Sequence, residues 1–298
     1  MSHFSVMVIG PNVDEQLAPY HEFECTGAND QFVQNIDITT DLQGEIDKYL
    51  EENPNAYDEA LKEALGYYGL EDSVIDDESK ADIVGDECEH KYGYAVVKDG
   101  KLVKAVDRTN PNKKWDWWVV GGRWRGFLTG KDGKEHNELP KGQIDFEAMR
   151  SELATYATNE HDTFTRLVGE HKLMTWQEAR NQCKGEDGTE NIDAARELYH
   201  GQEAMKRIRE DKDFYMNHMF GGFDKFLVPR EQYIQAARDR ACSTYAIVKD
   251  GQWYAKGEMG WFGMSSDDMT QDDWNKRTAE LLDSLPDDTM ITIVDCHI

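Results

Sequence analysis

The two ends of the chain carry apolar runs that predict β-strands. Residues 3–9 read HFSVMVI and stop at Gly10-Pro11, a pair that breaks regular structure. Residues 289–298, TMITIVDCHI, are rich in β-branched side chains, which favour strands. We therefore predict that both termini lie in strands. We also predict that residues 3–9 and 290–297 are neighbours in one sheet, because pairing holds chain ends that otherwise fray.

A second strand pattern occurs twice, as two β-type runs joined by Asp-Gly. YAVVKDGKLVKAV covers residues 94–106, and YAIVKDGQWYAKG begins at Tyr245. Asp-Gly accepts the positive φ angles of a two-residue type I′ turn. Residues 94–106 and 245–256 are therefore predicted to be β-hairpins. Their turns fall at Asp99-Gly100 and at Asp250-Gly251.

Apolar residues at three- and four-residue spacings predict helices between the strands. They occur in an acidic region, 41–82, in a mixed-charge region, 145–241, and at 271–284 before the last strand. Strands, hairpins and helical insertions in this order predict an α+β fold with a largely antiparallel sheet. We predict a sheet domain of residues 1–144 with 242–298, which includes the acidic region, and a mainly helical region of residues 145–241.

The formal net charge of −26 is unevenly distributed along the 298 residues. Residues 1–90 hold 23 acids and three bases, residues 91–257 hold 26 acids and 28 bases, and residues 258–298 hold ten acids and two bases. Such a field repels the phosphates of nucleic acids and membranes and attracts basic protein surfaces. We therefore predict no direct nucleic-acid partner and no membrane partner. The alternative is that the charge only confers solubility.

The acidic helical region is the predicted partner-binding surface. Carboxylates at helical spacing offer a charge density comparable with that of DNA, which carries about one charge per 1.7 Å of axis. A surface of this kind would engage the basic, DNA-facing side of another protein. The predicted binding residues are Glu51, Glu52, Asp58, Glu59, Asp76, Asp77 and Glu78.

Residues 113–130, KKWDWWVVGGRWRGFLTG, hold four tryptophans and a Gly-Gly pair. In a strand, Trp115 and Trp117 face one way and Trp118 the other. Since both faces carry tryptophan, we predict that these three side chains are mainly buried. The glycines at 121 and 122 indicate a bulge, a tight turn or close approach of another backbone.

A ligand groove is the alternative interpretation of this segment, with tryptophan for stacking and arginine for anions. The Walker and dinucleotide spacings that a phosphate loop needs are absent, and a strand and turn follow instead of a helix. The candidate groove residues are Trp115, Trp117, Trp118, Arg123 and Arg125.

The cysteines and histidines show no catalytic or metal-binding spacing, so we predict no catalytic residue, metal or cofactor. The five cysteines, an odd number without paired spacing and without a preceding signal peptide, favour free thiols in a reducing compartment. One hypothesis remains open. If the terminal strands pair, His3 approaches His297, which suggests a hydrolase or metal site. Buried thiols and hydrogen-bonded structural histidines are the alternative. The cysteines are Cys25, Cys88, Cys183, Cys242 and Cys296.

Five segments together resemble a recurring family of phage-encoded proteins of mostly unassigned function. They are MSHFSVMVIG, QLAPYHEFECTG, WDWWVVGGRW, YAIVKDGQWYAKGEMGWFGM and SLPDDTMITIVDCHI. The resemblance covers both ends and both hairpins, but neither helical region, and it implies no site residue. In size and acidity the chain is similar to phage proteins that block bacterial immune complexes, with the Gabija anti-defence proteins as the first candidates.

The resemblance implies a counter-defence protein in the host cytoplasm. It would bind and inhibit an anti-phage immune complex, such as a DNA-processing nuclease complex, through the acidic surface and without catalysis, and it could form a homo-oligomer. Two other classes stay open: a nucleotide or small-molecule binding or hydrolysing protein that uses the Trp/Gly/Arg groove, and an acidic structural phage protein.

Overall fold

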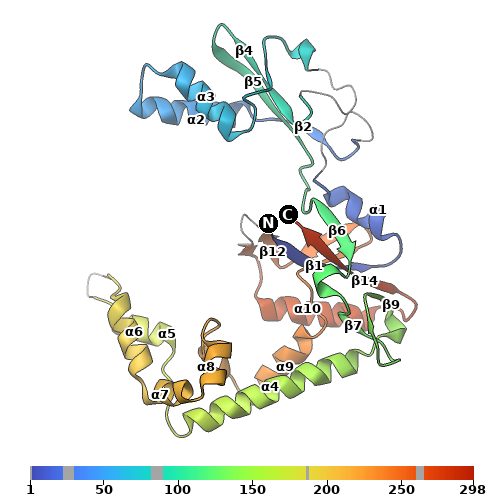
Figure 1. The fold of residues 1–298 in the computed structure, drawn as a ribbon, viewed down its shortest axis with the longest axis vertical. Helices are drawn as coiled ribbons and strands as arrows, with labels where there is room; N and C mark the ends of the chain where they lie inside the picture. The colour runs from blue at the N-terminus through green and yellow to red at the C-terminus, as the bar shows by residue number, and fades with distance from the viewer. Residues whose placement is uncertain (1, 23–29, 82–89, 186–187, 260–264) are drawn as a thin grey trace. The chain divides into compact units, whose positions relative to one another are not determined.

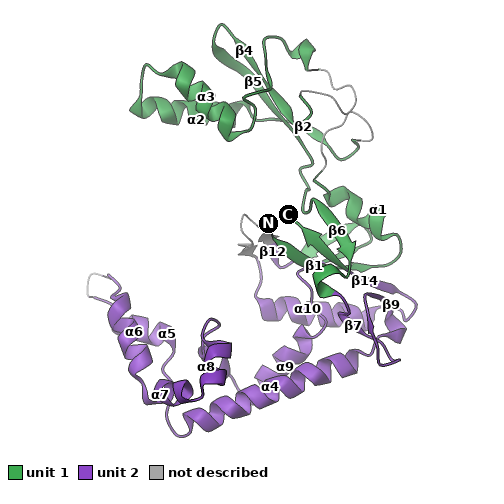
Figure 2. Cartoon of the chain, in the orientation of Figure 1, with its two compact units in different colours: residues 1–124, 247–254, 294–298 green, residues 125–246, 255–293 purple. Residues whose placement is uncertain are grey.

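The protein has an α+β fold with a strand at each end (Figure 1). The computed structural model describes residues 2–22, 30–81, 90–185, 188–259 and 265–298. The chain divides into two compact units (Figure 2). One comprises Met1–Trp124, Ile247–Tyr254 and Val294–Ile298, and the other Arg125–Ala246 and Ala255–Ile293. The predicted helical region, 145–241, falls wholly in the second of these units. No helix within the described ranges has the length and apolar composition to cross a bilayer.

The terminal strands pair as predicted. Strands β1 (His3–Ile9) and β14 (Met290–His297) are neighbours in a six-stranded sheet of order β11-β10-β1-β14-β6, in which β9 (Glu138–Pro140) also pairs with β14. Ser2 and Ile298 exchange both backbone hydrogen bonds, with N···O distances of 2.9 and 3.0 Å, which identifies an antiparallel pair. Nearly all of β1 and β14 is buried, which explains their continuous apolar runs.

Both predicted hairpins are confirmed. The first joins β4 (Gly93–Lys98) to β5 (Lys101–Thr109), and the second joins β10 (Ala246–Lys249) to β11 (Gln252–Ala255). All four turn residues have positive φ, 50° and 72° in the first turn and 53° and 72° in the second, as a type I′ turn requires. The two hairpins belong to different sheets.

We call residues 34–109 the acidic lobe. Its four-stranded sheet has the order β2-β5-β4-β3, where β2 is Gln34–Asp37 and β3 is Val74–Ile75. Helices α2 (Thr39–Glu52) and α3 (Tyr57–Tyr67) pack on one face of that sheet (Figure 1). The helices contribute apolar side chains at helical spacing, and the sheet contributes two alanines. The buried contacts include Leu42, Ile46, Leu61, Leu65, Ala95 and Ala105.

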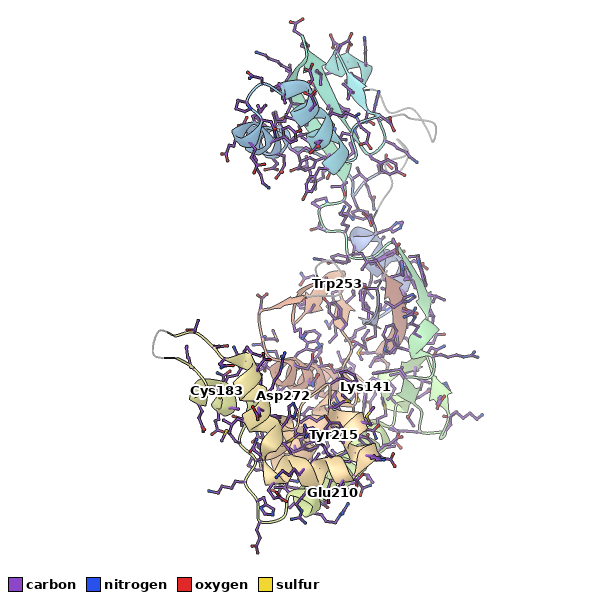
Figure 3. All side chains as sticks on the ribbon, turned by 60° about the vertical axis from the view of Figure 1, so that its left-hand side comes forward. Lys141, Cys183, Glu210, Tyr215, Trp253 and Asp272 are labelled. Carbon is purple, nitrogen blue, oxygen red and sulfur yellow. The ribbon has the colours of Figure 1, made fainter. Side chains whose placement is uncertain are left out.

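The mixed-charge region is helical, as predicted, and has an aromatic core. Its helices are α4 (Phe146–Val168), α5 (Trp176–Gln182), α6 (Ile192–Gly201), α7 (Glu203–Glu210), α8 (Lys212–His218) and α9 (Arg230–Arg240). Figure 3 labels Cys183, Glu210 and Tyr215 in this region. The core includes Phe164, Met205, Phe214 and Phe226. Helices α6 and α7 are separated at Gln202, which has an extended backbone.

The remaining elements are short, except for one helix. Helix α10 is Gln271–Ser284, the range predicted from the sequence. The others are α1 (Val13–Leu17), β6 (Trp117–Val120), β7 (Leu128–Thr129), β8 (Glu135–His136), β12 (Gly257–Met259) and β13 (Ser265–Asp267).

Candidate functional site

Four of the seven predicted acidic residues lie where α2 ends and α3 begins. Glu51 and Glu52 are in the last turn of α2, and Asp58 and Glu59 are in the first turn of α3. All four are exposed. Within the part of the chain that the structure describes, no hydrogen bond or ion pair engages their carboxylates. We call these four residues the free acidic face.

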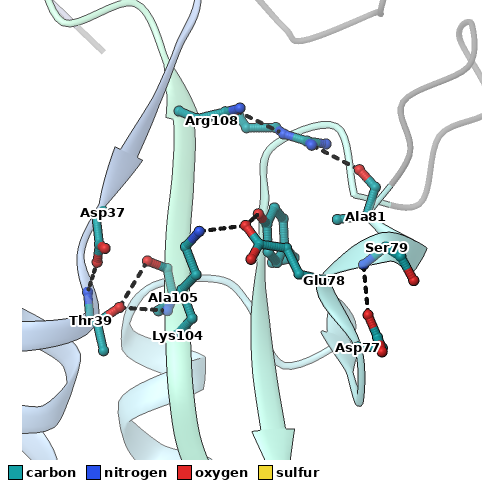
Figure 4. Close-up of polar contacts among 11 residues, drawn as sticks. Asp37, Thr39, Asp77, Glu78, Ser79, Ala81, Lys104, Ala105 and Arg108 are labelled. Carbon is teal, nitrogen blue, oxygen red and sulfur yellow. Dashed lines mark hydrogen bonds and ion pairs between the residues drawn. The ribbon is translucent and has the colours of Figure 1, made fainter.

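The other three predicted acids are engaged in local structure, and Figure 4 shows two of them, Asp77 and Glu78. The Asp77 carboxylate accepts a hydrogen bond from the Ser79 backbone N–H at 2.9 Å. Glu78 accepts from the Tyr94 hydroxyl at 3.0 Å and forms an ion pair with Lys104. The Lys104 ammonium is the main reason why the pKa of Glu78 lies below its usual range. Asp76 forms an ion pair with a lysine four residues further along, which lowers its pKa in the same way. Their charges are therefore partly neutralised.

A shallow acidic groove of about 330 Å³ lies between α2 and α3. Its lining combines carboxylates, one lysine and two tyrosines, and Tyr67 is 76 % exposed. The sequence does not predict this groove, because it depends on how the two helices pack. The lining residues are Glu45, Lys48, Tyr49, Glu52, Ala60, Glu63, Ala64 and Tyr67.

The tryptophan segment is less buried than predicted. Trp115 is buried, at 6 % exposure, and stacks on His21 with ring centroids 4.4 Å apart. Trp117 is 43 % exposed and Trp118 is half-buried, so the prediction that all three are mainly buried was wrong. The reason is that β6 lies at the end of the six-stranded sheet's order, where β14 is its one neighbour among the described strands. The side chains of Arg123 and Arg125 are exposed.

The predicted approach of His3 to His297 is present. Because Ser2 pairs with Ile298, His3 lies opposite His297 on the neighbouring strand, and the two ring centroids are 4.9 Å apart. His297 in turn lies opposite Trp117 of β6. Their rings are stacked, with centroids 5.1 Å apart and an interplanar angle of 16°. These three residues, which we call the row of rings, lie on the neighbouring strands β1, β14 and β6. The rings of His3 and Trp117 also contact each other edge to face, with centroids 5.3 Å apart and an interplanar angle of 80°.

Each histidine of this row forms a hydrogen bond with a carboxylate through Nδ1. His3 Nδ1 lies 2.8 Å from Asp295 Oδ1. His297 Nδ1 lies 2.7 and 2.9 Å from the two carboxylate oxygens of Asp116. A carboxylate only accepts hydrogen bonds, so Nδ1–H is the donor in both pairs. We call these four residues the paired dyads.

The turn at the Gly-Gly pair holds the carboxylate of Asp295 in place. The second oxygen of Asp295 accepts a hydrogen bond from the Arg123 backbone N–H at 2.9 Å. Gly122 has a φ of +50°, and a Cβ atom there would lie 2.4 Å from the Asp295 side chain. The glycine thus permits the close approach that the sequence suggested, and the group that approaches is a carboxylate.

The sequence pointed to His3 and His297, but it did not identify their carboxylate partners. The spacing of Asp295 and His297 puts both on one face of β14, and this spacing could have identified Asp295 from the sequence. Asp116 could not be found in this way, because its role depends on the pairing of β6 with β14. Among the described residues, no three His, Cys, Asp or Glu side chains are arranged to hold a metal ion. Cys25 and Cys88 lie outside the described ranges.

Comparisons with protein-family profiles, with curated proteins and with solved structures found no match to this chain. The free acidic face with its groove and the row of rings with its paired dyads are therefore the two candidate functional sites.

Proposed function

We propose that the protein is a non-enzymatic phage counter-defence protein that binds a basic, DNA-facing surface of a bacterial immune complex through the free acidic face. The expected target is a DNA-processing nuclease complex in the host cytoplasm. The observation that carries this proposal is the set of four exposed carboxylates at the α2–α3 junction without a described cation partner.

The contrast within the acidic lobe supports this choice of surface. Residues 34–109 hold 20 acids and eight bases, and several of the bases are used to neutralise acids such as Glu78. At the α2–α3 junction, no described residue provides such a partner for the carboxylates of Glu51, Glu52, Asp58 and Glu59. Unpaired like charges repel one another, so a partner that supplies cations relieves this repulsion as it binds.

The charge of this surface increases the association rate and orients the approaching partner more than it increases the affinity. An exposed ion pair is worth about 0–1 kcal/mol, so single contacts contribute little. Several carboxylates acting together steer a basic partner and raise the association rate, an effect that salt screens. The groove adds short-range contacts, because a lysine or arginine that enters it meets the three glutamates of its lining and the ring of Tyr67, which favours cation–π contact.

A capture experiment with a fourfold charge reversal tests the proposal. The tagged protein is used to capture partners from cells that carry anti-phage defence systems, with mass spectrometry as the readout. We expect a nucleic-acid-processing complex to be recovered, and an added DNA duplex to compete for it. We expect at least tenfold less complex to be captured by the variant Glu51→Lys, Glu52→Lys, Asp58→Lys, Glu59→Lys. Its circular dichroism spectrum should stay unchanged.

A matched control reverses the same number of charges elsewhere. Its four positions are exposed acids of the helical region without an ion pair to any described residue: Glu170, Glu197, Glu210 and Asp213. This control should capture the partner as the wild type does. Equal loss in both variants would show that only total charge matters. Equal capture by both would show that the free acidic face is not the binding surface.

A further inference from the structure

We infer that the row of rings is a binding site for a divalent transition-metal cation of the kind that prefers imidazole, with His3 Nε2 and His297 Nε2 as its two protein ligands. This site is separate from the free acidic face and does not depend on the counter-defence role. Four observations support it. They are the carboxylates bonded to Nδ1 of each histidine, the Nε2 atoms without a described partner, the distance between the two rings, and the negative charge around them.

The Nδ1 hydrogen bonds match what metal-binding histidines require. A histidine that ligates a metal through one nitrogen almost always donates its other N–H to a carboxylate or carbonyl group, which fixes the ring and its tautomer. Both His3 and His297 do so, at 2.8 Å and 2.7 Å. The Nε2 atom of each ring is thereby left as the lone-pair nitrogen. Neither Nε2 has a hydrogen-bond partner among the described residues.

The spacing of the two rings is compatible with one shared ion. Zinc–nitrogen bonds are about 2.0–2.1 Å long, so two imidazoles that share a tetrahedral ion have ring centroids roughly 5 Å apart. The observed separation is 4.9 Å. Cross-strand neighbours in an antiparallel pair hold this distance because both backbones are fixed by the sheet. With two protein ligands, water or an external ligand completes the coordination shell.

The negative charge around the two rings favours a cation over a phosphate or another anion. The carboxylates of Asp295 and Asp116 lie directly behind the two rings, and the whole chain carries a net charge of −26. An anion would be repelled by both. A cation is attracted by both carboxylates.

The site is partly open to solvent. The side chains of His3 and His297 are 13 % and 8 % exposed, and that of Asp116 is 41 % exposed. Trp117 adds a built-in reporter, because its ring lies parallel to His297 at 5.1 Å. A paramagnetic ion at Nε2 would quench the fluorescence of Trp117.

Titration with Zn²⁺ by calorimetry and with Co²⁺ by tryptophan fluorescence tests the inference. We expect one ion per chain, a micromolar dissociation constant, and Co²⁺ quenching that disappears in Trp117→Phe. His297→Ala should weaken binding at least tenfold. Asp116→Asn, which keeps the side-chain size, should weaken it by about tenfold, the lower end of the effect of removing such a carboxylate. His136→Ala is the matched control, because it removes another His–Asp pair, with Asp132 at 3.1 Å.

The inference is overturned if neither ion binds below millimolar concentration, or if His297→Ala binds as tightly as the wild type. Equal loss in His136→Ala would also overturn it. If His297→Ala unfolds the protein, His297→Gln and Asp116→Asn provide the same comparison.

Discussion

At the scale of single residues, Gly122 shows how one position sets the geometry of a site. We predict that Gly122→Ala destabilises the protein more than Gly251→Ala. Both positions have positive φ, but only at Gly122 would a new Cβ collide with the buried carboxylate of Asp295. The left-handed backbone costs each variant about 1–2 kcal/mol, and the collision adds roughly 1–3 kcal/mol. Urea denaturation measures the difference, and equal losses of stability would contradict the packing that we describe.

The thiols provide a second prediction at this scale. Burial raises the pKa of Cys242 to about 12 and also raises that of Cys296, whereas Cys183 is only half-buried. At pH 8 roughly one Cys242 in ten thousand is a thiolate, the form that reacts. We expect limited alkylation and peptide mapping to find Cys183 modified well before Cys242 and Cys296. After unfolding in urea the three should react alike. Early labelling of Cys242 in the native protein would contradict its burial.

At the scale of elements, a buried polar network joins three helices and a short turn of the helical region. His218 of α8 lies 3.2 Å from Glu160 of α4, and the Lys225 ammonium donates to its Nδ1 at 3.1 Å. The Tyr233 hydroxyl of α9 donates to Glu160 at 3.0 Å. Burial, and then the nearby Lys225, lower the pKa of His218. The neutral ring therefore accepts from the lysine and donates to the glutamate.

This network predicts a pH-dependent stability. The unfolded state binds a proton at His218 near pH 6.5, whereas the folded state does so only at lower pH. The contribution of His218 is therefore complete above about pH 6.5 and is lost as the pH falls toward the folded pKa. Between pH 7.5 and 5.5 the urea midpoint should fall more for the wild type than for His218→Gln, whose amide does not titrate. Parallel curves for the two proteins would show that His218 is not held neutral.

The elements also show which parts of the fold could be predicted from the sequence. Asp-Gly turns, the terminal strands and α10 depend on local chemistry, so their positions were predicted correctly. The exposure of Trp117 could not be predicted, because it follows from the place of β6 at the end of a sheet order. Asp116 belongs to the paired dyads for the same non-local reason.

At the scale of the whole molecule, paired and unpaired acids occur in both the acidic lobe and the helical region, and the free acidic face groups four unpaired acids at one junction. The helical region pairs several of its acids with bases, such as Arg230 with Asp162 and Arg238 with Glu147, whereas the free acidic face lacks described partners. This grouping motivates the proposed binding of a basic partner. The expectation of a homo-oligomer stays a prediction, which sedimentation analysis of the purified chain would test.

The most direct test of the central claim is the salt dependence of binding to the captured complex. With purified partner, the association constant is measured from about 50 to 500 mM NaCl, over which screening becomes strong. We predict that affinity falls steadily with salt for the wild type and for the control reversed at Glu170, Glu197, Glu210 and Asp213. For the variant reversed on the free acidic face, affinity should start lower and fall less. Affinity that is independent of salt and survives this reversal would contradict binding through the acidic surface.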